Sequence, residues 1–311
     1  MPDIVVTEFM DESALAPLRA AYDLVYDPTL VDRPADLAAL VPQARALIVR
    51  NRTQVRGALL AAAGKLEVVG RLGVGLDNID VEACRARNIK VCPATGANDL
   101  CVAEYVICGV LMLLRGAYFA TAEVADGGWP RNRLMGREAS GRTLGLVGFG
   151  AIAREVARRA VALGMQVVAY DPFLKAGHPA FGEHQARPVS LDVLLAESDA
   201  VSLHVPLTDA TRGLIGPDAL ARMRADAVLI NAARGGVVDE AALADALKAK
   251  RLGGAMLDVF DREPLPGGGP LVGVPNLILT PHIAGVTEES NVRVSAVIAR
   301  DVARALEAPR S

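Results

Sequence analysis

Arg234, Glu263 and His282 each follow a short hydrophobic run in the second half of the chain. Histidine readily gives and takes a proton near neutral pH, and a neighbouring carboxylate stabilises and orients the protonated imidazole. An arginine fork binds a carboxylate and keeps its charge. Such a set suits hydride transfer to a carbonyl beside a carboxylate, because the carbonyl oxygen needs a proton as the hydride arrives.

Each of these residues also has an ordinary structural explanation. A single histidine is more often a packing residue than a catalytic one, Arg234 suits an exposed surface, and Glu263 before Pro264 suits a loop. A shared site is favoured by their places after successive predicted strands, since the carboxyl ends of parallel strands line the ligand crevice of an open sheet. We therefore expect Arg234 to bind the substrate carboxylate, His282 to supply the proton and Glu263 to orient the histidine.

Short β-branched runs alternate with alanine-rich stretches, which is the pattern of parallel sheets covered by helices on both faces. We expect two such α/β domains, each doubly wound. The first series of predicted strands covers residues 4–9, 23–27, 46–50, 66–72 and 89–94. The second covers residues 143–148, 166–170, 200–204, 227–231, 254–259 and 277–280, which suffices for a dinucleotide-binding sheet.

Two long helices are predicted near the domain boundaries. The first begins at about residue 98, with Asn98 or Asp99 as its N-cap. The second covers residues 288–306, and its amphipathic pattern predicts that it packs back onto the first domain. We therefore predict a substrate domain of residues 1–97 plus 287–311 and a dinucleotide-binding domain of residues 98–286.

A glycine-rich turn, Gly148-Phe149-Gly150-Ala151-Ile152-Ala153, joins the first strand of the second series to a helical stretch. In that setting the first glycine allows the tight turn, the second lets a pyrophosphate approach the backbone, and the small third residue allows close helix packing. The N–H groups at the helix N-terminus then bind the phosphates. Alone, such a turn is weak evidence, since many glycine-rich turns are purely structural.

A carboxylate at the end of the next predicted strand strengthens this assignment. Asp171 stands where an acidic side chain hydrogen-bonds the ribose hydroxyls of a dinucleotide. Its charge would also repel a 2′-phosphate, and no arginine follows directly. We therefore predict NAD rather than NADP as the cofactor.

The bulk composition argues against several other functions. The 311 residues carry a formal net charge of -3, so there is no overall positive field to attract nucleic acid or anionic membranes. The first residues lack the positive segment of a signal peptide, and no apolar run reaches the roughly 20 residues that a bilayer requires. We expect a cytoplasmic protein with reduced cysteines and, because no HExxH spacing occurs, no metal.

Seven segments together resemble the D-isomer-specific 2-hydroxyacid dehydrogenases, and the resemblance spans essentially the whole chain. The segments are residues 70–80, 94–106, 141–153, 204–208, 230–240, 257–264 and 280–285. The resemblance implies a Rossmann NAD-binding domain, a smaller flavodoxin-like substrate domain, and hydride transfer between NAD(H) and C2 of a small 2-hydroxy or 2-oxo acid. It also implies that Arg234, Glu263 and His282 are the family's catalytic triad.

Further binding residues follow from this resemblance and from the glycine-rich turn. For NAD they are Val102, Gly148, Gly150, Ala151, Ile152, Asp171, Pro206, Ala232, Ala233, Arg234, Asp258, His282, Ala284 and Gly285. For the substrate they are Arg52, Val74, Gly75, Arg234 and His282. Glycines beside Val74 suit the close approach of a ligand to the main chain.

The sequence says less about which 2-hydroxy acid is the substrate. Arg50 and Arg52 follow a predicted strand of the first domain and suggest a substrate with a second anionic group. The alternative is that both are simply solvated charges at the rim of the predicted cleft. The segments around them are similar to the branch that contains sulfolactate dehydrogenases, so we expect sulfolactate or a phosphoglycerate-like acid. The alternatives are a dehydrogenase of phosphite or formate, and an NAD-sensing corepressor. A corepressor would carry added disordered tails that recruit its partners, and we do not expect such tails here.

Residues 116–137 are similar to the arm through which members of this family form dimers. They include Tyr118, Phe119 and Trp129, which would be a liability if left on the surface of a monomer. Packing within one chain is the alternative. We expect a homodimer.

Overall fold

The computed structural model describes residues 2–308, which fall into two compact units. Unit 1 is drawn from Met1–Asn98 and Gly285–Ser311, and unit 2 from Asp99–Ala284. The chain therefore leaves unit 1, builds unit 2 and returns.

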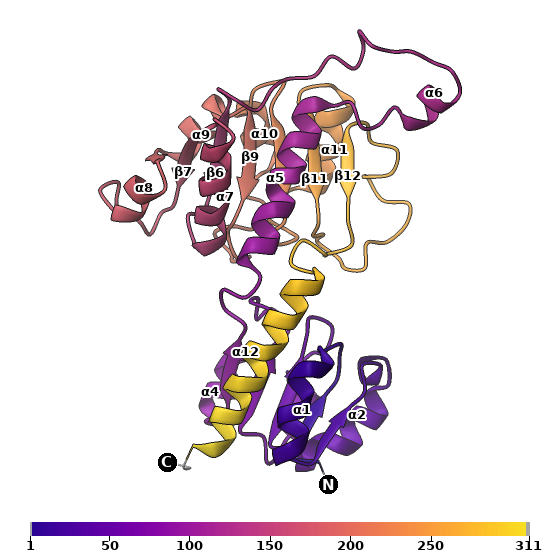
Figure 1. The fold of residues 1–311 in the computed structure, drawn as a ribbon, viewed down its shortest axis with the longest axis vertical. Coiled ribbons are helices and arrows are strands. Elements are labelled where there is room, and N and C mark those ends of the chain that lie inside the picture. Colours follow the sequence, from indigo (N-terminus) through magenta and orange to yellow (C-terminus); the bar gives the residue numbers. More distant parts are fainter. Residues whose placement is uncertain (1, 309–311) are drawn as a thin grey trace. The chain divides into compact units, whose positions relative to one another are not determined.

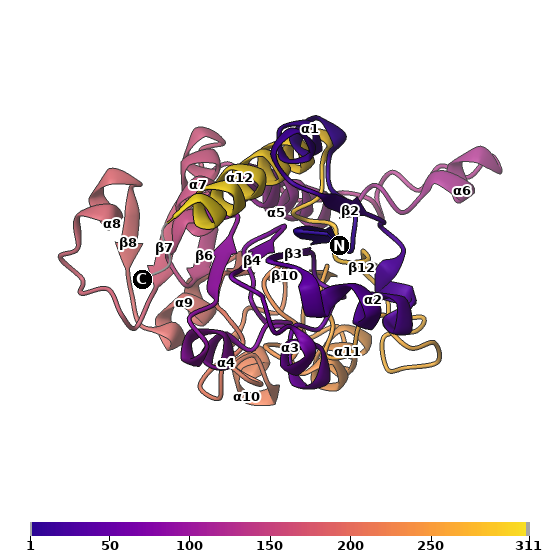
Figure 2. The ribbon, with the colours of Figure 1, turned by 90° about the horizontal axis from the view of Figure 1, so that it is seen from below.

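Unit 1 is a five-stranded parallel sheet with the strand order β2-β1-β3-β4-β5. The strands are β1 (Ile4–Val6), β2 (Leu24–Tyr26), β3 (Ala46–Val49), β4 (Val68–Arg71) and β5 (Lys90–Pro93). The helical elements are α1 (Glu12–Ala21), η1 (Leu30–Asp32), α2 (Pro34–Leu40), η2 (Val41–Gln43), α3 (Gly57–Ala62), α4 (Val81–Ala86) and α12 (Glu288–Glu307). Figure 2 shows α1 and α12 on one face of this sheet and α2 to α4 on the other. The predicted flavodoxin-like order is confirmed.

Helix α12 is an integral part of the unit 1 core. Its apolar face is buried with α1 and the inner strands, and a capping box of Thr287 and Ser290 fixes its start. Gly70 in β4 makes the close contact between sheet and helix possible, because a Cβ there would lie 2.7 Å from a methyl group of Ile298. The predicted return of this helix to the first domain is thus confirmed.

Unit 2 is a seven-stranded parallel sheet with the order β12-β11-β10-β9-β6-β7-β8. The strands are β6 (Thr143–Val147), β7 (Gln166–Tyr170), β8 (Ala186–Pro188), β9 (Ala200–Leu203), β10 (Val228–Asn231), β11 (Gly254–Leu257) and β12 (Leu277–Leu279). The helices are α5 (Asp99–Arg115), α6 (Thr121–Ala125), α7 (Ala151–Ala162), α8 (Pro179–Glu183), α9 (Leu191–Glu197), α10 (Pro217–Arg222) and α11 (Glu240–Lys248). Helices α5 and α7 cover one face and α9, α10 and α11 the other (Figure 1). This is the predicted Rossmann arrangement, with the strand order reversing between β6 and β9.

Strand β8 is the one element of this sheet that the hydrophobic pattern did not predict. It has three residues at the sheet edge, and two of them are Arg187 and Pro188. Proline and a charged side chain are typical of an exposed edge strand, because they discourage further pairing. No hydrophobic run marks such a strand in the sequence.

Candidate active site

The three proposed catalytic residues all lie beyond the carboxyl ends of neighbouring strands in unit 2. Arg234 follows β10, Glu263 follows β11 and His282 follows β12. The turn after β10 is shaped by the buried Asn231, whose amide donates to the carbonyl of Arg234 at 2.9 Å and accepts from the Ala233 N–H at 3.0 Å. The topology therefore brings to one sheet edge residues that are far apart in sequence.

His282 and Glu263 form a direct hydrogen bond, with Nδ1 2.7 Å from Oε2. The other oxygen of Glu263 accepts the main-chain N–H of Phe260 at 3.1 Å, which fixes the carboxylate. Burial raises the pKa of Glu263, but the hydrogen bond and charge of His282, with help from Arg234, lower the pKa overall. An ionised carboxylate on Nδ1 leaves Nε2 of His282 available for a substrate.

The backbone of His282 is in the left-handed region, with φ of +57°, which side-chain-bearing residues adopt only when their surroundings impose it. Asp258, only 1% exposed, accepts the main-chain N–H groups of Ile283 at 2.8 Å and Ala284 at 2.7 Å. Asp258, which the sequence predicts to bind NAD, thus also holds the segment that follows His282.

The glycine-rich turn fits a dinucleotide pyrophosphate. Gly148 has φ of +88°, and a Cβ there would lie 2.5 Å from the carbonyl oxygen of His204, so only glycine suits the turn. A Cβ on Gly150 would meet nothing within 4 Å, which leaves the approach open. Gly150 is also the N-cap of α7 and offers no side chain to the helix N–H groups, which stay available for an anion. Ala153 is fully buried beneath this turn.

Asp171 lies beside the same turn, just after β7. Its Oδ2 accepts the N–H of Phe149 at 2.9 Å and its Oδ1 accepts the N–H of Phe173 at 2.9 Å. The carboxylate is therefore fixed next to the nucleotide-binding turn.

Most other residues expected at NAD also lie along this edge or on α5. Those directly after a strand or turn of unit 2 are Ala151, Ile152, Pro206, Ala232, Ala233 and Ala284. Val102 is buried in the first turns of α5, and Gly285 is the residue at which the chain re-enters unit 1. The carboxyl edge of the unit 2 sheet thus carries a continuous run of proposed cofactor residues.

Comparison with known proteins decides the family. A profile of the D-isomer specific 2-hydroxyacid dehydrogenase NAD-binding domain matches residues 107–284. The (S)-sulfolactate dehydrogenase of Chromohalobacter salexigens is 56% identical over 98% of this chain and 99% of that enzyme. The chain belongs to the D-isomer specific 2-hydroxyacid dehydrogenases.

More distant relatives agree. The D-3-phosphoglycerate dehydrogenase of Archaeoglobus fulgidus is 40% identical over 96% of this chain, which spans about half (56%) of that protein. The D-lactate dehydrogenase of Aquifex aeolicus, crystallised with NAD and lactic acid, has a TM-score of 0.84 and 27% identity, covering 98% of this chain and 95% of that one. The protein is therefore an NAD-dependent 2-hydroxyacid dehydrogenase that acts on a CH–OH group, and the predicted enzyme class and cofactor are confirmed.

In unit 1 the loop that the sequence predicts to bind the substrate follows β4. Gly73 has φ of +146°, and a Cβ there would overlap the guanidinium of Arg71. The next residues, Val74 and Gly75, are half-buried, and their N–H groups meet no protein acceptor within residues 2–308. Adjacent main-chain donors of this kind suit a carboxylate.

The two arginines after β3 differ sharply. Arg52 is exposed, and its guanidinium pairs with Asp32 on the surface. Arg50 is mostly buried, so that desolvation lowers its pKa, and it donates to Oδ1 of Asn291 at 2.6 Å. Its guanidinium also lies 5.8 Å from the centre of the Phe9 ring. The sequence prediction named Arg52 as the substrate residue, because nothing in the sequence shows that Arg50 is the more buried of the two.

The negative charge of Glu8 raises the pKa of Arg50 and so opposes the effect of burial. Its carboxylate, however, accepts three main-chain N–H groups, those of Arg50 at 2.8 Å, Arg52 at 3.2 Å and Thr53 at 3.0 Å. Within residues 2–308 no carboxylate forms an ion pair with the Arg50 guanidinium. A mostly buried cation in this state favours an anionic ligand.

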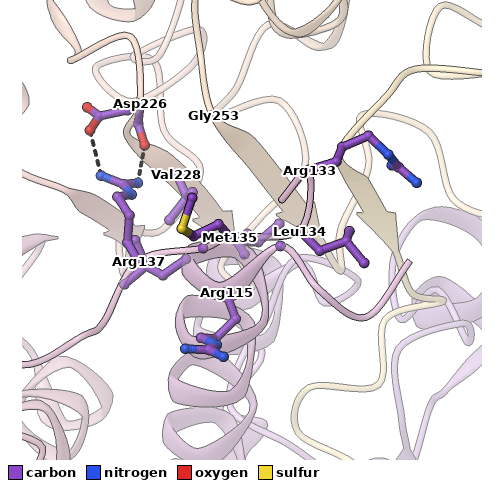
Figure 3. Close-up of a pocket in the computed structure, with 12 residues that line it drawn as sticks. Arg115, Arg133, Leu134, Met135, Arg137, Asp226, Val228 and Gly253 are labelled. Carbon is purple, nitrogen blue, oxygen red and sulfur yellow. Dashed lines mark hydrogen bonds and ion pairs between the residues drawn. The ribbon is translucent and has the colours of Figure 1, made fainter. Parts of the chain in front are cut away.

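The dehydrogenase also has a hollow of about 220 Å³ at the opposite, amino-terminal edge of the unit 2 sheet (Figure 3). It lies where α5 ends at Arg115 and β10 begins at Val228. One wall is Arg137, which pairs with Asp226. None of the proposed catalytic residues lines it.

Three further findings concern the described residues. None of their helices is long and apolar enough to span a membrane. No cluster of histidine, cysteine or acidic side chains in residues 2–308 is arranged to hold a metal ion. No disulfide joins the cysteines, of which three are buried and Cys108 is exposed.

Proposed function

We propose that this dehydrogenase uses His282 as its acid and base, Glu263 to orient the imidazole, and Arg234 to bind the substrate carboxylate and polarise the C2 oxygen. The observation that carries the proposal is the 2.7 Å hydrogen bond between His282 and Glu263 at the sheet edge that carries the nucleotide turn. Residues 98–286 would bind NAD, and residues 1–97 with 287–311 would bind the remainder of the substrate.

Held at the turn of Gly148 and Gly150, NADH would supply the hydride for C2 in the direction of reduction. As the C=O π bond breaks, the electron pair moves to the oxygen, which takes a proton from Nε2 of His282. Glu263 accepts from Nδ1 throughout and stabilises the imidazolium before transfer. Arg234 holds two oxygens of the substrate with its fixed fork and remains charged. Oxidation runs through the same groups in reverse.

For the substrate we propose a 2-hydroxy acid with a second anionic group, of which sulfolactate is the leading example and a phosphoglycerate-like acid the next. Support comes from the 56% identity to a sulfolactate dehydrogenase and from the guanidinium of Arg50, which forms no ion pair with a carboxylate of residues 2–308. Arg50 is a better anchor than Arg52, whose guanidinium is already occupied by Asp32. Val74 and Gly75 would hold the C1 carboxylate through their N–H groups.

The catalytic proposal is tested by His282→Ala. NADH affinity measured by fluorescence titration should be nearly unchanged, while kcat falls by about 10² to 10⁴. Near-normal turnover would remove His282 from the mechanism. A panel of sulfolactate, phosphoglycerate, glycerate, lactate, formate and phosphite, followed through NADH absorbance, tests the substrate. Preference for formate or phosphite would favour the alternative class of dehydrogenase.

We also propose a homodimer formed through residues 116–137. This segment and its helix α6 extend away from the rest of unit 2 (Figures 1 and 2), and its large side chains are exposed, with Trp129 at 77% and Met135 at 81%. Arg137 ties the end of the segment to the body of unit 2 through Asp226 and Asp199. An anchored segment with exposed apolar side chains suits contact with a second copy.

A further inference from the structure

The left-handed backbone of His282 must be imposed by neighbouring residues. Other described residues of this conformation that are not glycine include Asn88 and Asn276, and asparagine tolerates it better than most side chains. His282 lies between two residues that are held by hydrogen bonds. The carbonyl of Thr280 accepts the His282 N–H at 3.1 Å, and the N–H of Ile283 donates to Asp258.

Asp258 binds on both sides of His282. Besides the N–H groups of Ile283 and Ala284, it accepts the hydroxyl hydrogen of Thr280, with Oγ1 2.6 Å from Oδ1. One buried carboxylate therefore closes the loop from residue 280 to residue 284. The position of the imidazole depends on how firmly that carboxylate and Thr280 are held.

Thr280 is held in turn by helix α5, through a short hydrogen bond with the hydroxyl of Tyr105. Because the hydroxyl hydrogen of Thr280 is already donated to Asp258, Tyr105 must be the donor in this bond. Burial raises the pKa of Tyr105 to about 12, so the phenol keeps its proton at every working pH. The chain of donation thus runs from Tyr105 to Thr280 to Asp258.

A second contact ties the same loop to α5. The thiol of Cys101, one turn before Tyr105, donates to the carbonyl of Ala284 at 3.0 Å. Helix α5 therefore holds the loop at both ends, through Tyr105 at residue 280 and through Cys101 at residue 284. Of the residues in this network, only Asp258 and Ala284 belonged to the site expected from the sequence; Tyr105, Thr280 and Cys101 did not.

We propose that Tyr105 is a positioning residue for catalysis, acting through Thr280 and Asp258 to hold the His282 imidazole where its proton reaches the substrate oxygen. The proposal rests on the proposed role of His282. Loss of the Tyr105 hydroxyl frees Thr280 to rotate, loosens the loop and misplaces Nε2. Misplacement on the scale of an ångström is costly for proton transfer but does not disturb the nucleotide turn after β6.

The test is a double-mutant cycle of Tyr105→Phe and Thr280→Val with the full-length enzyme. Each single change should lower kcat by about 10-fold or more, leave the KM for NADH within about 2-fold, and increase the kinetic isotope effect with deuterated NADH. The double variant should be no slower than Thr280→Val, because the two hydroxyls act in one chain. Thr280→Ser, which keeps the hydroxyl, should restore most of kcat.

Tyr26→Phe is the matched control. It removes a partly buried phenol hydroxyl that donates to the carbonyl of Met10 at 3.2 Å in unit 1, so it should lower the melting temperature to a similar extent and leave kcat unchanged. Unchanged kcat in Tyr105→Phe, or strictly multiplicative losses in the cycle, would overturn the positioning role. His282→Ala measured in parallel separates the proposals, because its normal turnover would overturn the catalytic assignment itself.

Discussion

Replacement of Arg50 by methionine tests whether this side chain recognises the second anionic group of the proposed substrate. Methionine keeps the unbranched stem and removes the charge and its hydrogen bonds. In the wild type the guanidinium is mostly desolvated, is oriented by Asn291 at 2.6 Å, and has no ion-paired carboxylate among residues 2–308. A sulfonate or phosphate there would gain a charge-assisted hydrogen bond of about 1.5–3 kcal/mol.

That free energy corresponds to a loss of about 10- to 150-fold in kcat/KM for sulfolactate. Lactate has no second anionic group, so its kcat/KM should change little, and the ratio of the two values is the quantity to measure by NADH absorbance. Arg52→Met is the matched control. Its guanidinium is exposed and paired with Asp32, and the loss of such a pair costs roughly 0–1 kcal/mol, which is less than about 5-fold.

Equal losses for sulfolactate and lactate in Arg50→Met would refute the assignment, because the arginine would then serve the fold or a step common to both acids. A larger effect of Arg52→Met than of Arg50→Met on the ratio would refute it as well. Arg50→Lys should give an intermediate loss, since an ammonium keeps the charge but not the planar fork. Melting temperatures of all variants identify any general destabilisation.

Three further results are expected. Glu263→Gln should lower kcat near pH 7 by about 10-fold or more, because the carboxylate that orients the imidazole is gone; unchanged turnover would contradict this role. Trp129→Glu should convert the proposed dimer to a monomer in light scattering, and a dimer that persists would place the interface elsewhere. Burial lowers the pKa of His204 from 6.5 to about 4, so the unfolded chain binds a proton that the folded chain refuses, and stability should fall as pH drops through this window. Urea unfolding of His204→Asn should lack that slope.

The fold was largely predictable because most strands are buried on both faces and therefore appear as hydrophobic runs. The runs that became β6, β9 and β10 are clear for this reason. The edge strand β8 is polar and short, and no comparable signal marks it. The prediction that Glu263 and His282 lie close together depended on the parallel topology, because the carboxyl ends of parallel strands meet at one sheet edge. There the two side chains form a hydrogen bond.

Other parts of the site could not be predicted, because their partners are distant in sequence. Arg50 and Asn291 are separated by 241 residues, and Tyr105 and Thr280 by 175. A tyrosine on an amphipathic helix is expected to pack against the core. Nothing in the sequence indicates which hydroxyl group its phenol will hydrogen-bond. Arg50 and Arg52 are equivalent in type and differ only in direction and burial, which depend on the loop after β3.

The return of α12 to unit 1 sets the order in which the chain can fold during synthesis. Unit 1 begins first, yet Val294, Ile298 and Val302 of its core belong to α12, so the part of the sheet face that α12 covers stays exposed until this helix has been synthesised. Unit 2 is contiguous from Asp99 to Ala284 and can close earlier. The core of unit 1, although it contains the first strands of the chain, is therefore completed only after all of unit 2 has been synthesised.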